Sequence, residues 1–237
     1  MTALGRLALA DAGEAADLAA FLGRLIRYDR AAAVRLQVGD GAVAVFGRPP
    51  AFEVLAVRTS RLAGVGAGPD VDELDVTVSA GELLEGIEES TGAVAVPGAV
   101  TGPPWAGVLP PRGGWRQVPG LPEPEAMRAA LAAAVAEFRA RDEALAPTER
   151  TRAARDRIGR EIWSRTLGDT ELPLRAVHAA QSLGFLRAGP AGADATPGAA
   201  SGAVALLAAG GWLRLRTPYG SIVVRRAGLG VLSVAPV

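Results

Sequence analysis

The sequence contains no cysteine, no lysine and no asparagine, and His178 is the single histidine among its 237 residues. The absence of lysine excludes Schiff-base chemistry and phosphate-binding loops of the G-x-x-x-x-G-K type. The absence of cysteine excludes thiol nucleophiles, disulfides and thiolate-bound zinc or iron–sulfur clusters. A lone histidine excludes H-E-x-x-H zinc peptidases, and no G-x-S-x-G nucleophile elbow occurs. The sequence therefore indicates no catalytic residue, no metal site and no cofactor.

Aromatic residues are also scarce, at 5% of a chain that is 49% hydrophobic, so we expect a core of Ala, Val and Leu. All 25 basic residues are arginines. Such a composition resembles that of proteins from G+C-rich, actinobacterial-like genomes. No apolar run approaches the roughly 20 residues that a membrane span needs, and the first residues do not follow the pattern of a signal peptide. We expect a cytoplasmic protein with no membrane association.

The net charge of zero conceals two oppositely charged halves. Residues 1–122 contain 10 arginines and 14 acidic residues, which gives a net charge of −4. Residues 123–237 contain 15 arginines and 11 acidic residues, which gives +4. This asymmetry accompanies a change in pattern along the chain, and it favours two parts that differ in character.

Residues 1–100 predict an α+β part, an antiparallel β-meander flanked by helices. A helix begins after the Asp11 cap, and its apolar residues recur at helical spacing as far as Ile26. The period then changes to two, which predicts strands over 34–38 and 43–45 around a Gly-Asp-Gly turn. Further strands are expected at 52–57 and 74–79, a helix after the Ser79 cap, and a strand at 93–100. The glycine-rich segment 64–75 is predicted to be a loop.

Residues 101–122 form a connecting segment rich in proline, in which we expect no regular element. Residues 123–237 predict a helical part that ends in a β-hairpin. Helices are expected at 125–145, from Thr148 to 165, and at 173–186, the last capped by Asp169 or Thr170. The Gly/Ala/Pro-rich run 188–202 is predicted to be a mobile loop. The hairpin spans 212–226 and pairs Leu213 with Val224 and Leu215 with Ile222, and a strand at 229–234 follows.

The order of three helices and an arginine-bearing hairpin is typical of a winged helix, which makes a DNA-binding regulator one alternative function. The third helix would enter a groove of the DNA and the hairpin would flank it. Arginine suits contacts with phosphates and base edges. The residues that would contact DNA are Arg175, Gln181, Arg214, Arg216 and Arg225.

A surface for a protein partner or for self-association is the interpretation that we favour. Trp105 and Trp115 lie in the connecting segment close to Arg112 and Arg116, and tryptophan and arginine are typical of interfaces. Core anchoring is the alternative for these tryptophans. Because the familiar catalytic constellations are absent, we predict a non-enzymatic protein-interaction or regulatory protein.

A second alternative is an enzyme that uses carboxylates or a metal bound through oxygen ligands. An acidic series between 70 and 89 offers oxygen ligands, although its helical spacing is also that of a solvated face. It comprises Asp70, Asp72, Glu73, Asp75, Glu82, Glu85, Glu88 and Glu89. His178 has no second histidine to complete a metal site, so we expect it to be structural.

Overall fold

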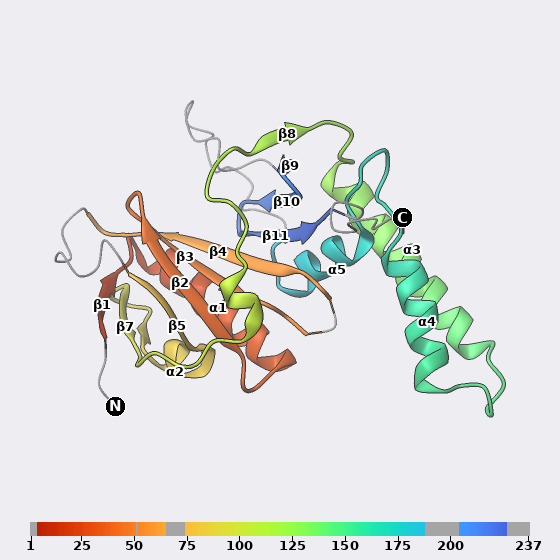
Figure 1. The fold of residues 1–237 in the computed structure, drawn as a ribbon, viewed down its shortest axis with the longest axis horizontal. Coiled ribbons are helices and arrows are strands. Elements are labelled where there is room, and N and C mark those ends of the chain that lie inside the picture. The colour runs from red at the N-terminus through yellow and green to blue at the C-terminus, as the bar shows by residue number, and fades with distance from the viewer. Residues whose placement is uncertain (1–3, 51, 65–73, 188–203, 227–237) are drawn as a thin grey trace, which may run out of the picture.

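The computed structural model describes residues 4–50, 52–64, 74–187 and 204–226 of this α+β protein (Figure 1). The loop predicted at 188–202 and the strand predicted at 229–234 lie outside these residues, as does most of the loop predicted at 64–75. An antiparallel sheet of eight strands dominates the fold, and its strand order is β5-β2-β3-β4-β11-β10-β9-β8. Its strands are β2 (Ala33–Gly39), β3 (Ala42–Gly47), β4 (Leu55–Arg61), β5 (Asp75–Ser79), β8 (Arg116–Val118), β9 (Ala205–Ala209), β10 (Trp212–Thr217) and β11 (Gly220–Arg225).

A second, small sheet contains the first strand of the described residues. Its order is β1-β7-β6, formed by β1 (Gly5–Ala8), β6 (Ile87–Glu88) and β7 (Ala93–Val96). The helices are α1 (Ala12–Tyr28), α2 (Ala80–Glu85), α3 (Pro124–Glu143), α4 (Arg152–Trp163) and α5 (Leu174–Ser182), with a 3-10 turn at Pro104–Gly107. α3 and α4 form an antiparallel helical hairpin that extends away from the sheet (Figure 1).

The predicted elements of the first part are largely confirmed. Asp11 caps α1, since its carboxylate accepts a hydrogen bond from the Glu14 amide at 2.9 Å, and Ser79 caps α2 in the same way. The strand predicted at 52–57 begins later, at Leu55, because Phe52 and Glu53 form a turn in which Glu53 has a φ of 53°. The strand predicted at 93–100 ends at Val96, directly before Pro97.

The helix boundaries of the second part needed correction. α4 is capped by Thr151 rather than Thr148, because residues 148–150 are still turning back toward Ala146. α5 begins after Pro173, and Thr170 does not cap it, since its hydroxyl donates to the Leu167 carbonyl instead. The connecting segment also contains regular structure, which the sequence prediction missed. Its short strand β8 lies between two prolines and pairs with β9 at the edge of the sheet.

The C-terminal hairpin has the predicted register but not the predicted surroundings. Leu213 pairs with Val224 and Leu215 pairs with Ile222, as expected. However, β10 also pairs with β9, and β11 also pairs with β4. The hairpin therefore occupies the middle of the large sheet and is not a projecting wing. The winged-helix architecture does not describe this protein.

One sheet spans both predicted parts of the chain. β4 from the first part and β11 from the second lie side by side at its centre, where Ser221, Ile222 and Val223 pair with Val57, Ala56 and Leu55. On either side of this seam the same sequence of elements occurs, a helix followed by a three-stranded meander. α1 precedes β2–β4, and α5 precedes β9–β11.

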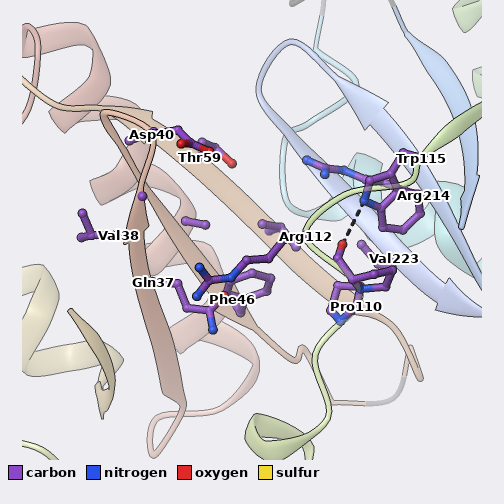
Figure 2. Close-up of a pocket in the computed structure, with 15 residues that line it drawn as sticks. Gln37, Val38, Asp40, Phe46, Thr59, Pro110, Arg112, Trp115, Arg214 and Val223 are labelled. Carbon is purple, nitrogen blue, oxygen red and sulfur yellow. Dashed lines mark hydrogen bonds between the residues drawn. The ribbon is translucent and has the colours of Figure 1, made fainter. Parts of the chain in front are cut away.

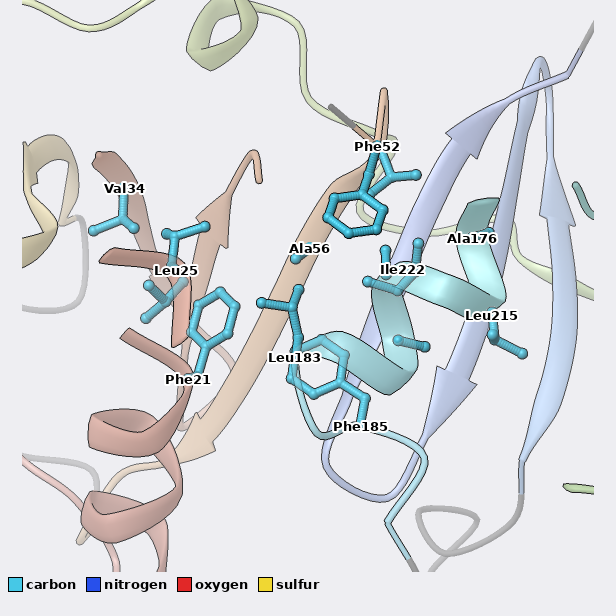
Figure 3. Packing of buried hydrophobic residues seen from close by; sticks show 14 of the residues in the cluster. Phe21, Leu25, Val34, Phe52, Ala56, Ala176, Leu183, Phe185, Leu215 and Ile222 are labelled. Carbon is cyan, nitrogen blue, oxygen red and sulfur yellow. The ribbon is translucent and has the colours of Figure 1, made fainter. Parts of the chain in front are cut away.

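The helices cover one face of the large sheet, which we call the inner face. α1 packs on β4 and α5 packs on β11, and the two helices meet the strands in one continuous apolar core (Figure 3). Phe21, Leu25, Leu183 and Phe185 are buried there against alternate strand residues such as Ile222. Because side chains alternate along each strand, the remaining half of the sheet residues point to the opposite, outer face.

Candidate functional site

No α-helix of the described residues packs on the outer face of the large sheet, and the connecting segment with its 3-10 turn crosses it instead. Its apolar centre consists of Phe46, Leu55, Val57 and Val223, all buried. Three of the four tryptophans pack against this centre, namely Trp105, Trp115 and Trp212, together with Leu109 and Ala44. Packing of this kind supports the anchoring interpretation of these tryptophans and leaves part of each indole ring accessible.

Several hydrogen bonds hold the connecting segment on the outer face. The Arg35 guanidinium donates to the Ala106 carbonyl at 2.8 Å and pairs with Asp75 at 2.7 Å. The Val100 amide donates to the Thr77 carbonyl, and the Trp115 indole N–H donates to the Pro111 carbonyl at 3.0 Å. The pKa of Asp75 is lowered, chiefly by its hydrogen bond with Arg35 and to a smaller extent by the nearby charge of Arg112. The segment thus lies in a fixed place over the sheet.

Two hollows remain beside the connecting segment. The first has a volume of about 280 Å³ and lies where the segment crosses β2–β4, β10 and β11 (Figure 2). Its floor is apolar, formed by Phe46, Val57 and Val223, and Trp115 forms part of its wall. The polar groups that line it are those of Gln37, Asp40, Thr59, Arg112 and Arg214.

The second hollow, of about 340 Å³, lies at the other side of the segment. Val223 lines both hollows, so the two are neighbours on one surface. Its apolar lining includes Trp105, Trp212 and Val108, and the Val108 side chain is 51% exposed. Its charged residues are Arg48, Glu53, Arg175 and Arg225, and the Arg225 guanidinium lies 4.4 Å from the centre of the Trp212 ring.

The structure brings most of the sequence-predicted site residues together on this surface. Some of them were predicted to contact DNA and the others to contact a protein partner. Arg112, Trp115 and Arg214 line the first hollow. Trp105, Arg175 and Arg225 line the second. Arg216 alternates with Arg214 on the outer face of β10, whereas Arg116 in β8 and Gln181 on α5 are exposed and line neither hollow.

Sequence reasoning missed several residues of this surface. Arg48, Val108 and Val223 line the second hollow, and Thr59 lines the first. Strand alternation would have placed Thr59 and Val57 on one face, but the pairing of β4 with β11 has no signal in the sequence. That pairing alone brings β3, β4 and β10 to one hollow.

Arg214 is the most unusual charged group of the outer face. It is partly buried, and its Nε donates to the Ser221 hydroxyl at 2.9 Å. Burial and the neighbouring charge of Arg216 lower the pKa of Arg214. The Nε of Arg216 is also buried and has no hydrogen-bond partner among the residues that the structure describes. Within the described residues, neither guanidinium forms an ion pair with a carboxylate.

Other arginines, both buried and exposed, have such partners. Arg58 pairs with Glu14 at 2.7 Å and with Asp17 at 3.4 Å. Arg187 pairs with Asp17, and its guanidinium also lies over the Tyr219 ring. A desolvated cation is costly unless an opposite charge lies beside it, and among the described residues Arg214 and Arg216 lack the carboxylate partners that Arg58 has.

The carboxylates do not converge into a candidate metal centre in the part of the chain that the structure describes. Of the acidic series, residues 70, 72 and 73 lie outside that part. Glu82, Glu85, Glu88 and Glu89 are exposed or half-exposed, and among the described residues no three acidic or histidine side chains gather closely enough to hold a metal ion. Glu137 and Arg141 of α3 form ion pairs with Arg165 and Glu161 at the end of α4. These contacts lower the pKa of Glu161 to about 2.

His178 lies on α5, away from both hollows, and packs between two aromatic rings. Its ring centre is 4.6 Å from that of Trp163 and 5.1 Å from that of Phe52. Burial lowers the pKa of His178, because the charged imidazolium would lose its hydration there. Its position is consistent with the structural role expected from the sequence.

This environment predicts a pH dependence of stability. Above about pH 7 the imidazole is neutral in both the folded and unfolded states, and its contribution is constant. As the pH falls through about 6.5, the unfolded chain takes up a proton that the folded protein resists, so the free energy of unfolding decreases until the pH reaches the lowered pKa of the folded state. Urea unfolding between pH 7.5 and 5 measures this slope. His178→Gln removes its titration, and an unchanged slope in that variant would contradict the assignment.

Comparison with known sequences divides the chain within the connecting segment. Residues 2–107 match a domain of unknown function, DUF8010. Residues 110–229 match a second domain of unknown function, DUF8185, over slightly more than half of the chain. No protein with a curated description matches, and no solved structure matches. No helix in the described ranges is both long and apolar enough to cross a membrane. The chain belongs to the family of proteins that contain the DUF8185 domain.

Proposed function

We propose that this chain is a non-enzymatic interaction protein that binds a partner polypeptide on the outer face of its large sheet. One observation carries the proposal, namely that three tryptophans and a set of arginines surround two adjoining hollows on the face opposite to α1 and α5. Tryptophan and arginine supply most of the binding energy in many interfaces. The hollows are at or near the lower end of the roughly 300–1,000 Å³ typical of small-molecule sites, which suits side chains of a partner.

DNA binding is less well supported by this arrangement. In the winged-helix hypothesis α5 would be free to enter a groove, but most of α5 is buried against β11 and the helical hairpin. Gln181 lines neither hollow, and Arg175 lines the second hollow rather than the first, in which Arg214 lies. A nucleic acid would therefore have to contact the sheet itself.

Two matched substitutions test the proposal. Val108 and Leu4 are each 51% exposed, but Val108 lines the second hollow and Leu4 lies before β1 beside the small sheet. When the full chain is immobilised and exposed to an extract of its native cells, we expect the Val108→Asp variant to lose the proteins that the parent binds and the Leu4→Asp variant to keep them. The far-UV circular dichroism of both variants should be unchanged. Sedimentation of both variants checks whether the partner is a second copy. Equal retention by both variants would refute this surface as the binding face.

A further inference from the structure

We propose that the first hollow binds an acidic side chain of the partner polypeptide, with the Arg214 guanidinium as the anion-binding group and the apolar floor as the seat of a neighbouring apolar side chain. The inference rests on the proposed function and names the chemistry that the partner presents. It draws on three independent observations, which concern charge, geometry and shape.

The charge argument concerns the missing counter-charge. Arg214 is partly buried, but its one hydrogen bond within the described residues is to the uncharged hydroxyl of Ser221. Arg216 stands two residues away on the same face, so two guanidinium groups lie close together without a carboxylate of the described residues. An incoming carboxylate would remove both the repulsion and the lack of solvation, because charge-assisted hydrogen bonds to arginine are strong in a partly desolvated site.

The geometric argument concerns how Arg214 is held. The Ser221 hydroxyl lies across the strand pair and fixes the Nε end of the guanidinium, which leaves the Nη atoms for another acceptor. The Trp115 ring, 5.7 Å from the guanidinium carbon, lies on the wall of the hollow and is oriented by its own hydrogen bond to Pro111. Preorganisation of this kind reduces the entropy lost on binding.

The shape argument concerns the floor of the hollow. Phe46, Val57 and Val223 form an apolar surface next to Arg214, and Arg112 adds a second positive charge from the connecting segment (Figure 2). Among the described residues, Asp40, in the β2–β3 turn, is the one carboxylate in the lining. A ligand that has a negative charge beside an apolar group matches the floor and the two arginines, whereas a bare inorganic anion would leave the floor uncovered.

A pair of blocked peptides provides the test. Each contains two phenylalanines that flank either a glutamate or a glutamine, and binding to the full chain is followed by the NMR signal of the Trp115 indole N–H. We expect the glutamate peptide to bind at least about tenfold more tightly than the glutamine peptide at low salt, with a difference that shrinks as salt is added. Equal binding of the two peptides would overturn the inference.

Substitution of Arg214 identifies the anion-binding group. We expect the preference for the glutamate peptide to disappear in Arg214→Met. In Arg214→Lys the preference should be reduced, because the planar fork of the guanidinium is lost. In the control Arg139→Met, on the exposed surface of α3, the preference should persist. The Arg214→Met protein should unfold at the same or a higher denaturant concentration than the parent, since no ion pair is broken. A preference that survives in Arg214→Met, or a loss of fold, would contradict the assignment.

Other ligands enter the same assay as competitors. Benzoate that binds as tightly as the glutamate peptide would show that a free organic acid is the ligand, and a short DNA duplex that displaces the peptide only when Arg214 is present would favour a nucleic acid. Either result overturns the polypeptide assignment. If peptide discrimination fails while Val108→Asp still abolishes partner retention, the inference about Arg214 is wrong and the proposed function stands.

Discussion

Replacement of Arg58 by alanine will lower the free energy of unfolding by about 3–5 kcal/mol, because it removes the buried cation of an ion-pair network and leaves Glu14 and Asp17 with only the more exposed Arg61 and Arg187. The Arg58 side chain is 6% exposed and connects three elements of the core. Its Nη2 pairs with Glu14 and Asp17 of α1, and its Nη1 donates to the Tyr219 carbonyl in the β10–β11 turn at 3.0 Å. The Glu14 side chain is 13% exposed, so little water can replace the guanidinium.

Arg61 provides a matched control on the same carboxylate. Its Nε contacts Glu14 at 3.1 Å, but its side chain is 70% exposed. Exposed ion pairs contribute about 0–1 kcal/mol, so Arg61→Ala should change the stability little. Guanidinium chloride unfolding of the two variants measures the difference. Similar losses in both would mean that burial does not determine the strength of this network.

Phe185→Ala will cost about 3–5 kcal/mol, a loss typical of a large buried ring. The ring is 2% exposed and its centre lies 5.6 Å from that of Phe21 on α1. It also covers Gly220 at the start of β11, where an added Cβ would come within 2.6 Å of the ring. Phe185 therefore joins the helix of the first half to the turn of the second.

The same contact predicts a coupling between Phe185 and Gly220. Gly220→Ala alone should cost about 1–3 kcal/mol, because the methyl group collides with the ring and the φ of 155° is unfavourable for alanine. In the Phe185→Ala background part of that cost should vanish, since the ring is gone. A double-mutant cycle measured by chemical unfolding quantifies the coupling. If the losses of unfolding free energy in the two single variants were strictly additive, the Phe185 ring would not contact Gly220.

Local signals predicted the elements of this fold well and its assembly poorly. The Asp11 and Ser79 caps, the β2–β3 hairpin and the register of β10 with β11 all depend on neighbours in the sequence, and all are confirmed. The β4–β11 pairing joins residues more than 160 positions apart. The sequence of neither strand indicates which distant strand it pairs with, so the sequence alone predicts an isolated hairpin of the winged-helix type.

The candidate site was predicted in its residue types but not in its location. Arginine and tryptophan were recognised as binding residues, yet Arg214 was assigned to DNA and Trp115 to a protein partner. Both line one hollow, because the connecting segment folds across the outer face and returns to the sheet as β8. That Arg214 has no ion pair among the described residues could not be predicted, since ion pairing depends on which of the 25 acidic residues lie nearby in space.

The seam at the centre of the large sheet has a consequence for related chains. The two matched domain families meet within the connecting segment, yet their strands β4 and β11 share a hydrogen-bonded border. A chain with only one of these domains would expose the backbone donors and acceptors of that border strand, an edge prone to pairing with other chains. Such a chain would have to bind a second domain to cover that edge. In this protein the two domains are covalently linked, so the edge is paired within one chain.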